Sequence, residues 1–175
     1  MGVGKWHTSC SADPVFMRNL KLYLETSVWN FVFADDTPEK RDIMIEFFEK
    51  IKQGEYDVFI SQTVLSEIDR ADEAKKWQLM QLIKECNPQM LDITQEVVDL
   101  SKEYISQRII PEAKVEDALH VAVASVYEMD AVITWNNRHL ANLRKMEKIN
   151  GINLREGYSK HIELVNPMEV ITDEN

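Results

Sequence analysis

The segment from Val115 to Trp135 constrains the fold more than any other part of the chain. Residues 115–129, VEDALHVAVASVYEM, are apolar on nearly every side between Ala118 and Val126. A helix with this composition is buried all round. The stretch that follows, AVITW at 131–135, is a continuous apolar run, which is typical of a strand in a parallel sheet covered on both faces. We therefore expect both elements in the interior of a layered α/β domain.

The rest of the chain alternates strand patterns with helix patterns. We expect strands at 20–25, 57–61 and 90–94, helices over about 37–53, 63–71, 73–86, the stretch after Thr94 and 138–148, and one or two short strands or turns at the end. This alternation indicates a three-layer α/β/α sandwich with a mainly parallel central sheet. We predict one domain over 19–175. We expect residues 1–18 to be a polar tail that is either disordered or not native. In the second case, Met17 is the natural first residue.

Composition excludes several classes of protein. No window approaches the roughly 18 consecutive apolar residues of a membrane span, and the first residues lack the apolar centre of a secretory signal. The two cysteines have no CxxC spacing and the four histidines are scattered, so neither a disulfide framework nor a zinc site built from them is expected. We predict a cytoplasmic protein that is not bound to a membrane.

The charge of the chain is negative overall but unevenly distributed. A net charge of −10 argues against nonspecific binding of nucleic acid through bulk charge. Residues 22–130 contain 11 basic and 23 acidic residues, whereas residues 131–160 contain 6 basic and 2 acidic residues. The basic segment is either a solvated helix face or a surface that meets phosphate.

Four polar side chains stand where apolar elements begin or end. Glu25 ends the first strand, Glu67 lies in an apolar short helix, Asp117 begins the most buried helix, and Asn136 follows AVITW. Each has an ordinary structural explanation: a solvent-facing strand end, a solvated helix position, a first-turn acid or a helix N-cap. However, ligands of parallel α/β sheets bind at the carboxyl ends of strands. Asp130 precedes its strand and is expected at the opposite edge of the sheet.

Together these side chains predict a cation site. Carboxylates that lie close together repel one another unless a cation compensates. Mg²⁺ or Mn²⁺ suits a cluster of oxygen ligands. A metal held in this way activates water and stabilises charge on a phosphoryl oxygen, which is the chemistry of a metal-dependent nuclease.

Four stretches, in this order, resemble the PIN domain and more narrowly the VapC-type toxins of toxin–antitoxin modules: YLETSVWNF, SQTVLSEI, EDALHVAVA and ITWNNRHLAN. The resemblance runs from about Leu20 to the C-terminus. It implies an α/β/α domain with Mg²⁺- or Mn²⁺-dependent endoribonuclease activity that leaves a 3′-hydroxyl and a 5′-phosphate. It also implies an RNA substrate, a cognate antitoxin and a homodimer.

The resemblance places the family's metal ligands at Glu25, Glu67 and Asp117, and its fourth catalytic position at Asn136. Two departures stand out, because the family has Asp at the first position and an acid at the fourth. Glu25 has one more methylene group than Asp. Asn136 can ligate through its oxygen or orient a water, but it cannot accept a proton as a base.

Neighbouring polar residues are expected to support this site. Thr26, Ser27 and Thr134 are expected to hold the acids, and the RNA backbone is expected to contact Arg138, His139, Arg144 and Lys145 within the basic segment 138–160. His120 is interpreted as a core histidine rather than a base.

Two other functions stay open at the level of sequence. The departures at Glu25 and Asn136 favour a PIN-fold module that binds protein or RNA with weak or no catalysis. A Mg²⁺ phosphatase of another α/β class would need an Asp nucleophile in an early strand-end loop, where this chain has Glu25.

Overall fold

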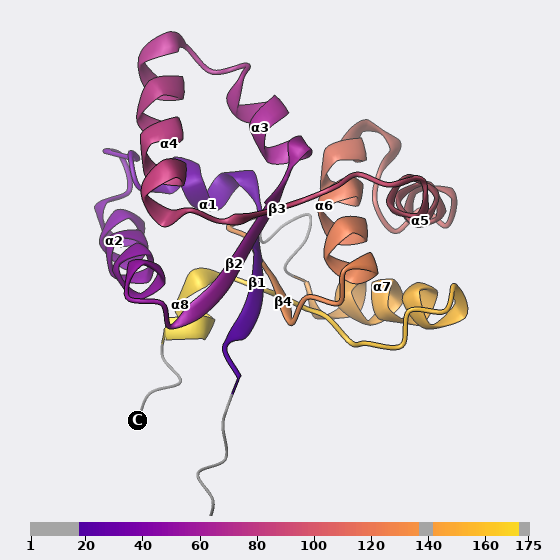
Figure 1. The fold of residues 1–175 in the computed structure, drawn as a ribbon. Helices are drawn as coiled ribbons and strands as arrows, with labels where there is room; N and C mark the ends of the chain where they lie inside the picture. Colours follow the sequence, from indigo (N-terminus) through magenta and orange to yellow (C-terminus); the bar gives the residue numbers. More distant parts are fainter. Residues whose placement is uncertain (1–17, 137–141, 172–175) are drawn as a thin grey trace, which may run out of the picture.

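A computed structural model describes residues 18–136 and 142–171, so Cys10, Arg138 and His139 lie outside the described residues. Figure 1 shows the order of the elements, which is β1 (Leu20–Leu24), α1 (Thr26–Phe31), α2 (Pro38–Lys52), β2 (Tyr56–Ser61), α3 (Gln62–Ile68), α4 (Glu73–Cys86), β3 (Gln89–Leu91), α5 (Gln95–Ser106), the 3₁₀ helix η1 (Glu112–Lys114), α6 (Val115–Val126), β4 (Ala131–Ile133), α7 (Leu143–Arg155), β5 (Glu163–Val165) and α8 (Pro167–Ile171).

The strands form one five-stranded sheet in the order β3-β2-β1-β4-β5, with every neighbouring pair parallel. In Figure 1, α2, α4 and α8 lie to one side of the sheet and α5, α6 and α7 to the other. The predicted three-layer α/β/α architecture with a parallel sheet is therefore confirmed. Such a sheet brings the carboxyl ends of all its strands to one edge.

The central strand β1 is buried on both of its faces. Leu22, Tyr23 and Leu24 are all fully buried, although the alternating pattern of LKLYL is typical of a half-buried strand. The strand is fully buried, and not half-buried as its pattern suggests, because helices cover both sides of a parallel sheet. Helix α6 is buried at Ala118 and from His120 to Ser125, as its composition predicts, whereas Leu119 and Val126 are partly buried.

Three local features differ from the sequence-based expectations. Residues 26–31, for which the sequence pattern predicts no helix, form helix α1, and the Glu25 side chain caps it. Helix α7 ends at Arg155, seven residues beyond the expected end at residue 148, and its expected start at residue 138 lies outside the described residues. Asn142 caps the helix by accepting from the backbone N–H of Lys145 at 3.2 Å. The short helix α8 was not expected.

The amino edge of the sheet is closed by ion pairs around Asp130. Its carboxylate accepts hydrogen bonds from Arg18 at 2.7 Å, from Lys160 at 2.6 Å and from the backbone N–H of Lys21 at 2.8 Å. This confirms that Asp130 lies at the edge opposite Glu25. Across the described residues, no helix has both the length and the apolar character needed to span a membrane.

Candidate metal centre

Glu25 lies between the end of β1 and the start of α1, and its carboxylate folds back over that helix. Its Oε2 accepts from the backbone N–H of Ser27 at 3.2 Å, from the Ser27 hydroxyl, and from the Thr134 hydroxyl at 2.9 Å. Glutamate is not among the common N-cap residues, but the Glu25 carboxylate caps α1 by accepting from the Ser27 N–H. Glu25 is only 5% exposed, so its orientation is closely fixed.

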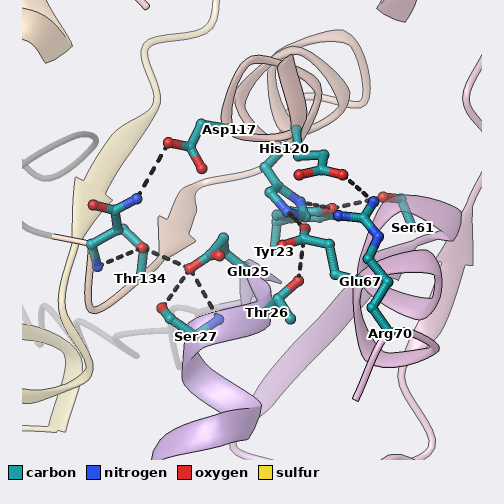
Figure 2. Close-up of polar contacts among 12 residues, drawn as sticks. Tyr23, Glu25, Thr26, Ser27, Ser61, Glu67, Arg70, Asp117, His120 and Thr134 are labelled. Carbon is teal, nitrogen blue, oxygen red and sulfur yellow. Dashed lines mark hydrogen bonds and ion pairs between the residues drawn. The ribbon is translucent and has the colours of Figure 1, made fainter. Parts of the chain in front are cut away.

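Thr134 and Asn136 connect Glu25 to Asp117. The Thr134 hydroxyl donates to Glu25 and accepts from the backbone N–H of Asn136 at 2.9 Å. The Asn136 side-chain amide then donates to Oδ2 of Asp117, in the first turn of α6, at 3.3 Å. Figure 2 shows Glu25, Thr134 and Asp117 along this series of contacts.

Glu67 reaches the same region from the last turn of α3. Its Oε1 accepts from the Thr26 hydroxyl at 3.0 Å and from Nε2 of His120 at 2.6 Å. Burial acts to raise the pKa of Glu67, but the hydrogen bonds from His120 and Thr26, together with the nearby positive charge, hold that pKa below its usual value. Glu67 is therefore a carboxylate at neutral pH.

His120 is fully buried, as expected of a core histidine, yet both of its ring nitrogens have polar partners. Its Nδ1 lies 2.7 Å from the Tyr23 hydroxyl, which in turn lies 2.7 Å from the Ser61 hydroxyl. Burial acts to lower the pKa of His120, but the hydrogen bond to Glu67 and the surrounding carboxylates raise it above its usual value.

Tyr23 and Ser61 are polar members of this region that the sequence interpretation missed. Each lies within or at the end of an apolar strand pattern and looks like an ordinary strand residue. The one available signal is that a tyrosine and a serine, which both need hydrogen-bond partners, occupy strands expected to be buried on both faces.

The arrangement fits a divalent cation. Polar atoms of Glu25, Glu67 and His120 lie within 4.8 Å of one another, a separation that two ligands of one cation with bonds of roughly 2.1–2.5 Å span. Because both ring nitrogens of His120 take part in hydrogen bonds, the two glutamates are the members of this group that can ligate a cation. Among the described residues, every hydrogen bond to Glu25 ends on Oε2 and every hydrogen bond to Glu67 ends on Oε1. Each glutamate is thus held by one oxygen and keeps its second oxygen for a ligand.

The basic residues of the predicted RNA surface divide between two places. Lys145, near the start of α7, is close enough to Asp117 to sense its charge; partial burial lowers the pKa of Lys145, and Asp117 acts in the opposite direction. Arg144 is exposed beside it. At the far end of α7, Arg155 pairs with Glu103 and Glu156, and Lys160 pairs with Asp130 at the amino edge of the sheet.

Lys160, the last residue of the basic segment 138–160, is held by Asp130 at the edge of the sheet opposite the acidic cluster. Arg155 is separated from Lys145 by ten residues of helix, a rise of about 15 Å. Within the described part of the basic segment, Lys145 at the start of α7 is the residue near Asp117.

Comparisons with known proteins bear on the fold. No protein family matches the sequence, and no curated protein matches it either. A chain in the crystal structure of VapBC2 from Rickettsia felis, bound to a DNA fragment from their promoter, is similar over 83% of this chain and 98% of its own length, with 12% identity and a TM-score of 0.52. A chain of VapBC-5 from Mycobacterium tuberculosis, a member of the VapBC family of toxin–antitoxin systems, aligns over the same shares with 14% identity and a TM-score of 0.46.

The likeness to the Rickettsia felis structure extends over nearly the whole of that chain, so it concerns the complete fold and not one motif. The chain thus has the VapC/PIN-like fold that its four motifs predict.

Proposed function

We propose that this protein is a metal-dependent endoribonuclease that acts as the toxin of a type II toxin–antitoxin module. The observation that carries the proposal is the pair of glutamates at the carboxyl edge of the sheet. Each is held through one oxygen, with its second oxygen left without a hydrogen bond from the described residues, and both lie in the region that Asp117 and Asn136 also reach.

Glu25, Glu67 and Asp117 would hold Mg²⁺ or Mn²⁺. Such a cation lowers the pKa of a bound water and neutralises charge on a phosphoryl oxygen. Asn136 would orient a water or contribute its amide oxygen, since an amide cannot accept the proton of that water. Thr26, Ser27 and Thr134 keep the glutamates in place, because each donates a hydrogen bond to one of them.

The start of α7 is the proposed contact for the RNA backbone. Lys145 is near Asp117 and Arg144 is exposed beside Lys145, so these two residues supply positive charge next to the acidic cluster. Contacts of this kind position a nucleic acid without reading its sequence. Arg138 and His139, the other two residues of the predicted RNA contact, lie outside the described residues, and their contact with RNA stays a prediction.

An antitoxin partner and a homodimer complete the proposal. The similar chain from Rickettsia felis comes from a structure of VapBC2, and the four motifs resemble VapC-type toxins, which act with a cognate antitoxin. A bound antitoxin would cover the carboxyl edge of the sheet and exclude RNA from it.

A second candidate function is a PIN-fold binding module without catalysis. It is favoured by two contacts that balance the acids without any cation: His120 pairs with Glu67, and the Asn136 amide donates to Asp117. Under this alternative the same edge would bind RNA or protein without cutting it.

The test is cleavage of a structured RNA by the purified protein in Mn²⁺, followed on a denaturing gel. We expect cleavage that EDTA abolishes and that Asp117→Asn lowers at least about 100-fold. The exposed Asp92→Asn serves as the matched control and should cleave like the wild type. Equal cleavage by Asp117→Asn would indicate contamination and reject the nuclease, whereas RNA binding without cleavage would favour the binding module.

A further inference from the structure

We propose that Tyr23, His120 and Ser61 act as positioning residues that fix Glu67 relative to the other acids. Their hydrogen bonds form a buried relay with Glu67 at its end (Figure 2). This role rests on the function proposed above, in which Glu67 is a metal ligand. The hydrogen bonds themselves, and which group donates in each of them, do not depend on that function.

The relay ties both ends of one short helix to the rest of the site. Ser61 stands immediately before α3 and Glu67 lies in its last turn. Tyr23, from the central strand β1, contacts Ser61, and His120, from α6, contacts both Tyr23 and Glu67. Helix α3 is thereby held against the two elements that carry Glu25 and Asp117.

The Ser61 hydroxyl bonds to Tyr23 and does not cap the helix that Ser61 precedes. It occupies the N-cap position of α3 with extended backbone angles, yet its side chain makes no capping hydrogen bond. Thr94, Asp72 and Asn142 occupy the same position before other helices, and each caps its helix with its side chain. The Ser61 hydroxyl instead meets Tyr23 at 2.7 Å, so this serine serves the site rather than its own helix.

The direction of the hydrogen bonds follows from the chemistry of the groups. A carboxylate can only accept, so Nε2 of His120 carries a proton whether the ring is neutral or charged. In the neutral ring Nδ1 accepts from Tyr23, and Tyr23 then accepts from Ser61. All three residues are fully buried, so their polar side-chain atoms cannot bond to bulk water and are satisfied by these hydrogen bonds.

Removal of the Tyr23 hydroxyl should therefore act on the metal site from a distance. In Tyr23→Phe, Nδ1 of His120 loses its partner and the ring is no longer held at its far side. Glu67 then loses its fixed orientation, although no proposed ligand has changed. Removal of a group that orients a metal ligand typically weakens metal binding by about 10–100-fold.

Tyr104 offers a matched control. It is also fully buried, and its hydroxyl also contacts two polar groups, Ser125 and Asn153, but it lies between α5, α6 and α7 and away from the acids. Tyr104→Phe deletes the same atom from a comparable environment. Both variants should lose stability, and only Tyr23→Phe should lose metal affinity.

The experiment measures Mn²⁺ affinity by calorimetry on the full chain, with urea unfolding of each variant alongside it. We expect Tyr23→Phe to bind Mn²⁺ at least tenfold more weakly than the wild type, and Tyr104→Phe to bind like the wild type. Unchanged affinity in Tyr23→Phe, or an equal loss in both variants, would overturn the proposed relay.

If the wild type binds no Mn²⁺, the proposed function is rejected. The hydrogen bonds of the relay are then tested by a second measurement. Nitrogen NMR of the imidazole ring, assigned with a His120→Gln variant, reports which nitrogen carries the proton. We expect Nε2 to be protonated at every pH, and the His120 signals to shift in Tyr23→Phe but not in Tyr104→Phe. A neutral ring protonated on Nδ1 alone, or identical His120 signals in Tyr23→Phe and wild type, would contradict the relay.

Discussion

The hydroxyl of Thr134 donates to Oε2 of Glu25 at 2.9 Å and so joins the end of β4 to the end of β1. The same hydroxyl accepts from the backbone N–H of Asn136, which places the fourth polar position of the site. One short side chain thus fixes two of the four candidate residues.

Thr134→Val keeps the shape of this side chain and removes both hydrogen bonds. Because Glu25 is buried, we expect a loss of stability of about 1–2 kcal/mol and roughly tenfold slower RNA cleavage in Mn²⁺. Urea unfolding and a gel assay check these values. Thr37→Val is the control, since the Thr37 hydroxyl is buried with no hydrogen bond to the described residues and its loss should be neutral or stabilising. Equal effects in both variants would mean that Thr134 has no special role.

Asn136→Asp restores the acid that the family has at this position. The amide that donates to Asp117 becomes a carboxylate facing a carboxylate, so without metal we expect lower stability, by roughly 1 kcal/mol or more. Mn²⁺ should raise the Tm of Asn136→Asp by more than it raises the Tm of the wild type. The added carboxylate should bind the cation more tightly, and a ligand that binds the native state more tightly stabilises it more. Thermal unfolding with and without Mn²⁺ tests both effects. A variant that matches the wild type in both conditions would show that residue 136 does not face the cation.

Asp130 should make stability depend on pH at the amino edge of the sheet. The hydrogen bond from Arg18, helped by Lys160 and the backbone of Lys21, holds the pKa of Asp130 well below its usual value, although burial acts the other way. A carboxyl with a depressed folded pKa stabilises the protein above its unfolded pKa of about 3.9, and that stability is lost as the pH falls toward the folded value. Asp130→Asn should therefore lose less stability than the wild type between pH 7 and pH 3 in urea unfolding. Parallel pH curves for Asp130→Asn and the wild type would contradict the account.

Cys86 should react slowly with thiol reagents in the native protein. Burial raises the pKa of its thiol to about 11, and the thiolate is the reactive form. At pH 8 the thiolate fraction is then about 0.1%, so modification by an aromatic disulfide should be roughly 100-fold slower than in urea. The measurement uses a Cys10→Ser variant, so that Cys86 is the one remaining cysteine. Equal rates in the native and unfolded states would show that Cys86 is accessible.

The layered fold could be predicted because its strongest signals are local. The apolar helix α6 and the apolar run in β4 reveal burial on both faces within a single stretch of chain. Helix α1 was missed for an equally local reason. The sequence TSVWNF is rich in β-branched and aromatic residues, and its N-cap is a glutamate, which is not a usual helix start signal.

The internal structure of the site could not be predicted in the same way. Glu67 and His120 are 53 positions apart, and Tyr23 and His120 are 97 apart. Motif order indicated that Glu25, Glu67, Asp117 and Asn136 share one edge of the sheet. It did not indicate which oxygen of each glutamate is occupied, nor that a tyrosine and a serine support the histidine behind them.

The most direct test of the account is calorimetric titration of the wild type and Glu25→Gln with Mn²⁺, with Glu39→Gln, an exposed glutamate on α2, as the control. If the two glutamates and Asp117 hold one cation, the wild type and Glu39→Gln bind one Mn²⁺ per chain, and Glu25→Gln binds it at least tenfold more weakly. Equal binding by all three proteins, or no binding by the wild type, would contradict the metal centre.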